Sequence, residues 1–426
     1  MIRIMKYGET PNSEIFARTP MKTDVAGTVA AIIADVRKGG DAALRAYTRK
    51  FDHADLTDLA VTDAEIEEAM SQIDPEFIRI LQEAAGNIRK FHEKQVRSSF
   101  IINDTDGIAM GQKVIPMERV GLYVPGGTAA YPSTVLMDAI PAKIAGCPEI
   151  VMTTPPGRDG KLNPAIIAAA QVAGIDRIYK VGGAQAIAAL AYGTETIPRV
   201  DKIVGPGNAY VAEAKRQVYG QVSIDMIAGP SEILIVADEG MQPDILAADL
   251  LSQAEHDKMA SAVLVTDSMR LAEQVQAEIE KQIPLLDRRE IARASIDDNG
   301  KIIVTDTIEQ AIEAANEIAP EHLELALAQP FDWLDQVKHA GSVFMGYNCP
   351  EALGDYLAGP NHTLPTSGTA RFSSPLSVDD FVKKTQFTYF TRQALSRVAQ
   401  DIAYFARQEG LTGHARSAVI RTEEEK

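Results

Sequence analysis

Residues 119–125 read RVGLYVP, and four similar runs follow along the chain. Each run is short and rich in β-branched or aliphatic residues, and the stretches between them are mostly Ala-rich or amphipathic and long enough to form a helix. Alternating strand and helix patterns of this kind predict a parallel β-sheet with helices on both faces. The other runs are EIVMTTP (149–155), RIYKVGG (177–183), KIVGPG (202–207) and EILIVAD (232–238).

A second set of the same kind follows. SAVLVTD (261–267) and KIIVTD (301–306) have the pattern of buried strands, whereas RLAEQVQAEIEKQI (270–283) and IEQAIEAANEIA (308–319) have helical spacing of their apolar residues. We therefore expect an α/β protein with two Rossmann-like parallel-sheet domains, an N-terminal arm and a helical C-terminal tail.

The expected domain boundaries follow changes in composition. Residues 1–22 are polar, contain Pro11 and Pro20, and are expected to form an arm outside the first core. The segment from Thr23 to Gln95 has helical spacing, with a helix stop at Gly39-Gly40. The boundaries are a discontinuous first α/β domain (23–115 and 233–375), a second α/β domain (116–232) and a helical tail (376–426) associated with a dimer.

Charge and composition exclude several classes of protein. The 426 residues include 42 Lys and Arg against 59 Asp and Glu, a formal net charge of −17. Nucleic acids and anionic membranes attract concentrated positive charge, so neither is expected as a partner. The Ala-rich runs 165–175 and 184–192 are shorter than the roughly 18 residues of a bilayer span and are expected to be buried helices.

The chain has two cysteines, Cys147 and Cys349, which are too few for a disulfide framework. The opening MIRIMKYGET lacks the apolar core of a signal peptide, so we expect a cytoplasmic protein. A thiol nucleophile could oxidise an aldehyde, but neither cysteine has a histidine nearby in sequence. A structural role for both is the preferred interpretation.

Three of the strand runs end in glycine turns with polar neighbours. Glycine lets backbone N–H groups approach a phosphate, and the N-terminus of a following helix favours negative charge. None of the turns completes GxGxxG, because Tyr210 stands where the third glycine would be. Any one turn could serve only to join a strand to a helix, but three together favour a crevice for a dinucleotide. The polar neighbours are Tyr123, Gln185 and Asn208.

A second group of residues has the composition of a metal site. Gln253 and His256 are three apart, a spacing that puts both side chains on one face of a helix, although a solvated helix face would look the same. Asp355 and His414 are candidates for a further oxygen and a further nitrogen ligand. Four such ligands carry only one negative charge, so a bound Zn²⁺ would stay electrophilic and would suit an amine or imidazole.

Glu321 and His322 follow Pro320, and this order predicts that the pair opens a helix. Two adjacent titratable side chains could divide general acid–base work between them. A favourable first helical turn explains the same three residues without any catalytic role.

Taken together, these motifs closely resemble the histidinol dehydrogenase family, which carries out the last two steps of histidine biosynthesis. The resemblance runs from about Asp24 to Arg421. Residues 53–110 share the general residue pattern of the family but none of its distinctive motifs. It is densest in GLYVPGGTAAYPS, GGAQAIAALAYGTE, VGPGNAYVAEAKR, DMIAGPSEILIVAD, DLLSQAEHD, APEHLEL and GDYLAGPNHTLPTSGTARFSSPLSVDDF.

The resemblance implies a role for each candidate residue. Glu321 and His322 would be the proton acceptors of an NAD-dependent enzyme that oxidises L-histidinol through L-histidinal to L-histidine with two NAD. It also implies a homodimer whose C-terminal tails are exchanged. The NAD contacts would be Tyr123, Gln185 and Asn208; the ligands of one Zn²⁺ per subunit would be Gln253, His256, Asp355 and His414; and the substrate contacts would be Ser231, Gln253, His256, His322, Asp355, Glu409 and His414.

Two other functions fit the same residues. An enzyme on this scaffold could oxidise another small polar alcohol with zinc and NAD, although Glu409 and His414 favour a cationic nitrogenous substrate. A nucleotide-binding module with a purely structural metal would leave Glu321 and His322 without a task. Fold alone does not separate these functions, because function depends on the site.

Overall fold

The computed structural model describes residues 1–18, 24–126 and 130–423. The chain forms two compact units, the first from Met1–Gln95 and Glu118–Phe381 and the second from Val96–Met117 and Val382–Lys426. Pro20 of the expected arm and Gly127 of the first glycine turn lie outside the described residues.

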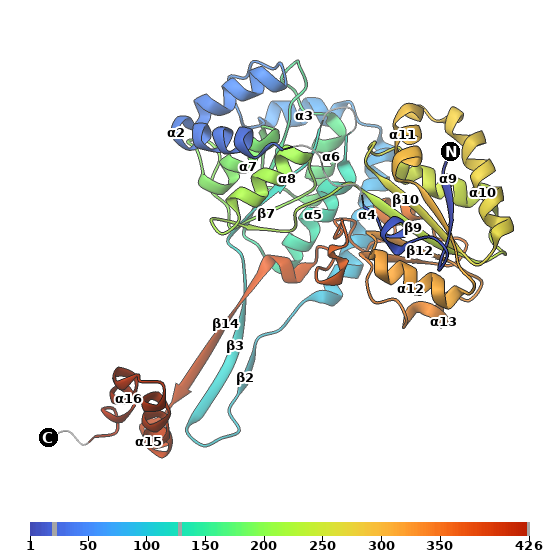
Figure 1. Cartoon of the computed structure of the whole chain (residues 1–426). Coiled ribbons are helices and arrows are strands. Elements are labelled where there is room, and N and C mark those ends of the chain that lie inside the picture. Colours follow the sequence, from blue (N-terminus) through green and yellow to red (C-terminus); the bar gives the residue numbers. More distant parts are fainter. Residues whose placement is uncertain (19–23, 127–129, 424–426) are drawn as a thin grey trace. The chain divides into compact units, whose positions relative to one another are not determined.

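The first unit contains a six-stranded sheet in the order β1-β11-β10-β9-β12-β13, and all of its pairs are parallel (Figure 1). Successive residues of a strand point to opposite faces, so Ile233 packs in one core and Leu234 in the other. Its strands are β1 (Arg3–Lys6), β9 (Glu232–Ala237), β10 (Ser261–Thr266), β11 (Lys301–Val304), β12 (His322–Ala326) and β13 (Ser342–Met345).

Helices cover both faces of this sheet, as the parallel arrangement requires. Apolar residues of α9 (Pro243–Ala254), α10 (Met269–Gln282) and α11 (Arg289–Asn299) complete one core. Those of α12 (Ile308–Ile318) complete the other.

The start of the chain belongs to this sheet. Strand β1 pairs with β11 at the sheet edge, and Ile2, Met5 and Ile15 are buried. The expectation that residues 1–22 stay outside the first core is therefore wrong for residues 2–15. The apolar residues Ile2 and Met5 are buried against opposite faces of the sheet, a pattern that the surrounding polar residues obscured.

A second parallel sheet, with the order β6-β5-β4-β7-β8, lies in the same unit. In this sheet β4 lies between β5 and β7. Strands β5 and β6 are added on one side of β4, and β7 and β8 on the other, so the direction of strand addition reverses at β4. Its strands are β4 (Arg119–Tyr123), β5 (Glu149–Thr154), β6 (Arg177–Lys180), β7 (Lys202–Val204) and β8 (Ser223–Ile224). Together the two sheets confirm the predicted parallel-sheet α/β fold without a GxGxxG turn.

The Ala-rich runs are buried helices, as predicted. They form α6 (Pro164–Ala173) and α7 (Gly183–Tyr192). Helices α5 (Pro132–Ala145) and α8 (Ala209–Val218) complete the set that follows the strands. Among the described residues, no helix combines the length and the apolar character needed to cross a bilayer.

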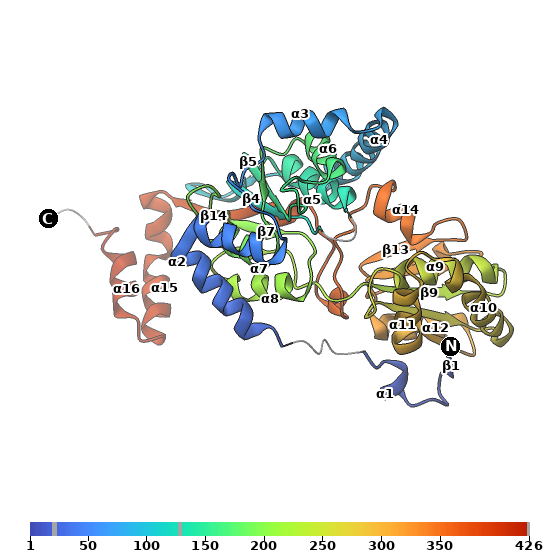
Figure 2. The same cartoon turned by 90° about the horizontal axis from the view of Figure 1, so that it is seen from above.

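The N-terminal helices pack on the second sheet's helices. Helix α2 (Ala26–Phe51) packs on α7 and α8, and its apolar residues share one core with Tyr123 and Tyr179 (Figures 1 and 2). Helix α4 (Pro75–His92) packs on α5 and α6, and α3 (Asp63–Ser71) on α6. This differs from the expected grouping of residues 23–115 with 233–375, because amphipathic spacing shows that a helix face is buried but not which sheet's helices it covers.

Gly39-Gly40 marks a break and not an end of α2. Gly40 has φ 48° and ψ −133°, values outside the helical region. A Cβ at Gly40 would lie 2.2 Å from a carboxylate oxygen of Glu195, which accepts a hydrogen bond from the Asp41 N–H at 2.8 Å. The break thus lets the Glu195 carboxylate meet the start of the second helical segment.

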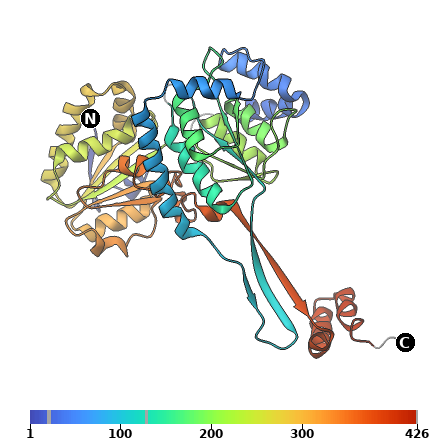
Figure 3. The ribbon, with the colours of Figure 1, turned by 180° about the vertical axis from the view of Figure 1, so that it is seen from behind.

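The second unit combines a three-stranded antiparallel sheet with a helical hairpin (Figure 3). Residues 382–390 form β14, although the tail was expected to be helical from its start. Thr, Tyr and Phe dominate the second half of that strand, and such residues favour strands when a partner is present. The elements are β2 (Phe100–Ile102), β3 (Ile108–Pro116), β14 (Val382–Phe390), α15 (Arg392–Gln408) and α16 (Thr412–Val419).

Short elements complete the chain. The most important for the site is α14 (Glu351–Tyr356), which follows β13. The others are α1 (Asn12–Ile15), α13 (Phe331–Leu334) and the 3-10 turns η1 (Glu93–Gln95), η2 (Ile283–Leu285), η3 (Thr369–Arg371) and η4 (Val378–Phe381).

The packing of α2 can be tested with Leu44, which is fully buried in the core that α2 shares with α7. Leu44→Ala should lower the free energy of unfolding by about 2–5 kcal/mol, because it removes buried methyl groups and leaves a cavity. Denaturant unfolding followed by circular dichroism measures the change. The exposed Lys38 on the same helix is the control, and Lys38→Ala should change stability by less than about 0.5 kcal/mol. Equal effects of the two variants would contradict this packing.

Candidate active site

Neighbouring strands bring the candidate catalytic residues to one edge of the six-stranded sheet. Strands β9 and β12 are parallel neighbours, with His322 opposite Ile233, so Glu232 and His322 both stand at strand starts. The prediction that Glu321 and His322 open a helix is wrong. The run HLELA is a buried central strand, and proline is also compatible with the position before a strand.

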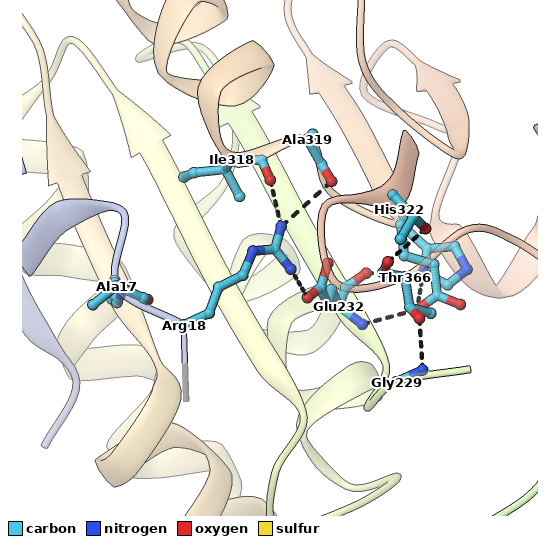
Figure 4. A network of polar contacts seen from close by, with 11 residues as sticks. Ala17, Arg18, Gly229, Glu232, Ile318, Ala319, His322 and Thr366 are labelled. Atoms are coloured by element: carbon cyan, nitrogen blue, oxygen red, sulfur yellow. Dashed lines mark hydrogen bonds and ion pairs between the residues drawn. The ribbon is translucent and has the colours of Figure 1, made fainter. Parts of the chain in front are cut away.

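The main chain of Glu232 holds both candidate side chains, and Figure 4 shows Glu232 beside His322. Its N–H donates to Oε2 of Glu321 at 2.9 Å, and its carbonyl oxygen lies 3.0 Å from Nδ1 of His322. A carbonyl oxygen can only accept, so the tautomer of His322 that donates from Nδ1 makes this bond and leaves Nε2 free to accept a proton.

Burial sets the protonation of this pair. Burial lowers the pKa of His322 to about 4, although the nearby Asp355 carboxylate raises it, so the imidazole is neutral at pH 7. Burial also raises the pKa of Glu321 well above its ordinary value, and the neighbouring carboxylate of Glu232 adds to this. The neutral imidazole has an unprotonated ring nitrogen at pH 7, and the raised pKa makes the Glu321 carboxylate, when ionised, a stronger base than an ordinary glutamate.

A contact from the N-terminal segment anchors Glu232. The Arg18 guanidinium pairs with the Glu232 carboxylate and also donates to the carbonyl oxygens of Ile318 and Ala319, which lie shortly before the catalytic pair (Figure 4). Arg18 thus connects residues on either side of the site.

Gln253 lies in the last turn of α9, and its Nε2 is 2.8 Å from Nδ1 of His322. An amide NH₂ group can only donate, so this contact requires Nδ1 as the acceptor, whereas the contact with the Glu232 carbonyl requires Nδ1 as the donor. The two contacts agree on a proton at Nδ1 only when the Gln253 amide is turned so that its oxygen faces the ring. The helix ends at Ala254, so His256 lies just beyond it, with its N–H bonded to the Gln253 carbonyl oxygen at 3.1 Å. The expected helical face shared by Gln253 and His256 is therefore wrong in detail. His256 is exposed, yet it lies near enough to lower the pKa of Asp355.

Helix α14 contributes two carboxylates from one face. Asp355 was predicted, and Glu351 lies four residues earlier, a spacing that puts both on the same side of a helix. Oε1 of Glu351 is 3.6 Å from Nε2 of His322, and one ligand atom from each of His322, Glu351 and Asp355 lies within 4.8 Å of the others. The pair is a candidate for metal binding.

The two carboxyl groups of α14 differ in charge. Burial, followed by the nearby Asp355 carboxylate, raises the pKa of Glu351 to about 9. Burial acts in the same direction on Asp355, but its hydrogen bond with His362 and the neighbouring histidines lower its pKa to about 2. Nδ1 of His362 lies 3.4 Å from Oδ1 of Asp355. Asp355 is therefore the ionised member of the pair.

Glu232 and Glu351 are the site residues that the sequence interpretation missed. The i, i+4 spacing of Glu351 and Asp355 was a signal for the second. The role of Glu232 is carried by its main chain, so no side-chain pattern could have indicated it.

The three glycine turns lie together at the carboxyl edge of the second sheet. Tyr123 ends β4, and its hydroxyl oxygen accepts from the Gly183 N–H at 3.1 Å, at the start of α7. Asn208 caps α8, with Oδ1 accepting from the N–H groups of Tyr210 (3.0 Å) and Val211 (3.2 Å). Gln185 is buried, and its Oε1 makes no hydrogen bond with the described residues.

A cavity of about 780 Å³ also lies at this edge, where β4 and β5 end. Such an edge, with helix N-termini pointing toward it, is where α/β sheets bind ligands. The residues that line the cavity include Asp52, His53, Gly126, Thr154, Arg158 and Asn163.

The remaining predicted residues divide between the two units. Ser231 is half-buried beside Glu232 in the first unit. Glu409 follows α15 and His414 lies in α16, both in the second unit and both exposed. The cluster of Glu232, Gln253, His322, Glu351 and Asp355 described above is built from the first unit alone.

The fold and the cluster are typical of an α/β enzyme: two buried titratable side chains lie beside a candidate metal site, and glycine turns follow the strands of the second sheet. The family model for histidinol dehydrogenase matches residues 17–422. The chain therefore belongs to the histidinol dehydrogenase family, whose members are oxidoreductases of histidine biosynthesis, and the predicted enzyme assignment is confirmed.

Individual relatives agree with this family. Histidinol dehydrogenase of Bacillus cereus is 57% identical over 399 residues, covering 94% of this chain and 93% of the relative. That of Clostridium acetobutylicum is 53% identical over 426 residues, covering 99% of each. A crystal structure of histidinol dehydrogenase from Elizabethkingia anophelis has a TM-score of 0.93 and 41% identity, covering 99% of this chain and 98% of that one.

The position of His322 predicts how strongly the reaction slows when its imidazole is removed. His322→Asn should lower kcat with L-histidinol by roughly 10²–10⁴-fold, the usual contribution of a general base. Metal analysis and circular dichroism should show normal zinc content and fold. A near-normal rate in this variant would remove His322 from proton transfer.

Proposed function

We propose that this enzyme oxidises L-histidinol through L-histidinal to L-histidine with two NAD and one Zn²⁺ per subunit. The observation that carries the proposal is the pair of proton acceptors, Glu321 and His322, held by the main chain of one residue, Glu232. Membership of the family supports the substrate. Oxidation of another small polar alcohol on the same scaffold is the alternative.

The proposed zinc ligands are Gln253, His256, Asp355 and His414. Asp355 supports this set, because its lowered pKa makes it the ionised ligand and it lies in the cluster of His322, Glu351 and Asp355, whose ligand atoms are within 4.8 Å of one another. One ionised ligand leaves zinc electrophilic, and when bound it would hold the amino and imidazole nitrogens of the substrate. Ser231, His322, Asp355, Glu409 and His414 complete the proposed substrate contacts.

The proposed cofactor contacts are Tyr123, Gln185 and Asn208, on the three turns at the edge of the second sheet. The helix N-termini of α7 and α8 support this placement for an anionic dinucleotide. NAD, when bound, would accept one hydride in each of two oxidations.

The proton transfers follow from the neutral state of His322. In the first oxidation, Nε2 of His322 accepts the proton of the substrate hydroxyl. Glu321 then accepts a proton from the water that adds to the aldehyde, and His322 accepts the proton of the resulting hydrate in the second oxidation. The raised pKa of Glu321 makes its carboxylate a stronger base for this task. No step uses a thiol, which agrees with the buried position of Cys147.

We also propose a cytoplasmic homodimer in which Glu409 and His414 of the partner subunit complete each site. The second unit supports this, because many large apolar side chains on its strands and helices are exposed, and exposed patches of this kind mark association surfaces. They include Ile101 (65% exposed), Tyr389 (61%), Tyr404 (67%) and Phe405 (68%).

The stoichiometry of the reaction tests the proposed activity. With zinc-loaded protein, excess NAD and limiting L-histidinol, absorbance at 340 nm should show about two NADH per substrate, because each of the two oxidations delivers one hydride. One NADH would contradict the role given to Glu321. No NADH with any alcohol would favour a binding module with a structural metal.

Mixed dimers test the tail exchange. Chains carrying His322→Asn and chains carrying His414→Ala should each be inactive alone. In a mixed dimer with exchanged tails, one site has both residues intact, so random reassociation should restore about a quarter of the wild-type rate. If each tail serves its own subunit, mixing restores nothing.

A further inference from the structure

Gly205 in the last of the three turns is held at both of its polar backbone atoms. Its N–H donates to Oδ2 of Asp225 at 2.8 Å, and its carbonyl oxygen accepts from Nζ of Lys215 at 2.9 Å. Gly205 has φ +116°, and a Cβ there would lie 2.0 Å from the carbonyl oxygen of Tyr123. This position therefore requires glycine, because any larger residue would collide with the main chain of Tyr123.

Lys215 is among the most buried side chains of the chain. Its side chain is 2% exposed, and it forms an ion pair with Asp225, whose side chain is 1% exposed. A second carboxyl group, that of Asp138, is fully buried, and its Oδ2 would lie 3.1 Å from a Cβ on Gly205. Burial, with Asp225 as the next cause, raises the pKa of Asp138 to about 7, while Lys215 lowers it.

Stability alone is a poor explanation of this cluster. Taking charges out of water is costly, and a buried ion pair is often no better for stability than apolar side chains of similar volume. The charged pair instead fixes the orientation of the backbone at Gly205, because Asp225 accepts from its N–H and Lys215 donates to its carbonyl oxygen. Lys215 lies on α8, whose N-cap is Asn208, so the lysine connects the body of the helix to the turn that precedes it.

We infer that Lys215, paired with Asp225, is a positioning residue for the cofactor, which fixes the Gly205–Asn208 turn so that Asn208 and the start of α8 meet the dinucleotide. The inference rests on the proposed NAD site. Lys215 touches neither substrate nor cofactor in this account and acts through the turn.

Loss of Lys215 should therefore weaken NAD binding selectively. Lys215→Met alone leaves Asp225 buried without its cation and can fail to fold, so the main variant is Lys215→Met/Asp225→Asn, in which the Asn oxygen can still accept from Gly205. Its KM for NAD and its Kd for NAD by calorimetry should rise roughly 10- to 100-fold, because small displacements of binding groups have effects of this size. The KM for L-histidinol and the zinc content should stay unchanged.

A matched control is available on the strand that leads into the turn. Lys202 is 5% exposed and pairs with Asp380 at 2.9 Å, but it lies at the start of β7, while Gly205 follows its end. Lys202→Met removes a buried lysine without touching the turn, and it should leave the Kd for NAD within about twofold of wild type, since sites without shared partners act independently.

A double-mutant cycle separates positioning from general destabilisation. Asn208→Ser removes the amide but keeps an N-cap, and its effect on NAD binding should be non-additive with that of the Lys215→Met/Asp225→Asn variant. An unchanged Kd for NAD in a folded Lys215→Met/Asp225→Asn protein, an equal change in Lys202→Met, or strictly additive effects with Asn208→Ser would overturn the inference. A wild-type protein that binds NAD but forms no NADH from L-histidinol would refute the proposed activity alone, whereas one that binds no NAD would overturn both.

Discussion

The main-chain contacts of Glu232 are the constraint on which the candidate active site depends. One peptide N–H holds Glu321 and one carbonyl oxygen lies against His322, so both candidate proton acceptors are placed by backbone atoms that side-chain motion cannot displace. This arrangement requires β9 and β12 to be parallel neighbours in their observed register, because a shift of one residue would turn His322 to the opposite face. Arg18 reinforces the geometry from the first segment of the chain.

The two sheets of the first unit contribute opposite edges to function. The proposed acid–base residues stand at the amino edge of the six-stranded sheet, whereas the proposed cofactor turns stand at the carboxyl edge of the five-stranded one. Buried polar contacts connect the segments that carry them. His362, which lies beside Asp355, has Nε2 3.2 Å from the Thr134 hydroxyl of α5, and the Thr363 hydroxyl donates to Asp138 at 2.9 Å.

Much of this could be predicted from the sequence, because parallel strands and their covering helices leave strong local patterns. The alternation after Pro116, the buried Ala-rich helices and the three glycine turns are examples. The sequence-based predictions were wrong where the structure of a segment depends on the segments that pack or pair with it in the folded chain. The residues after Pro320 have a pattern typical of the start of a helix, yet they form a strand because they pair with β9 on one side and β13 on the other. Residues 382–390 needed β3 as a partner to become a strand, and Glu232 acts through atoms that every residue has. The domain grouping of residues 23–92 was similarly undetermined by amphipathic spacing alone.

The protonation state of His322 tests this account most directly. Nitrogen-15 NMR of protein labelled in its histidines, with His322→Asn used to assign the resonance, reports the charge and tautomer of the ring in the folded holoenzyme. The account predicts a neutral ring between about pH 6 and 8, with the proton on Nδ1 and Nε2 free, because burial lowers its pKa to about 4. A doubly protonated ring at pH 7, or a neutral ring with its proton on Nε2, would contradict it.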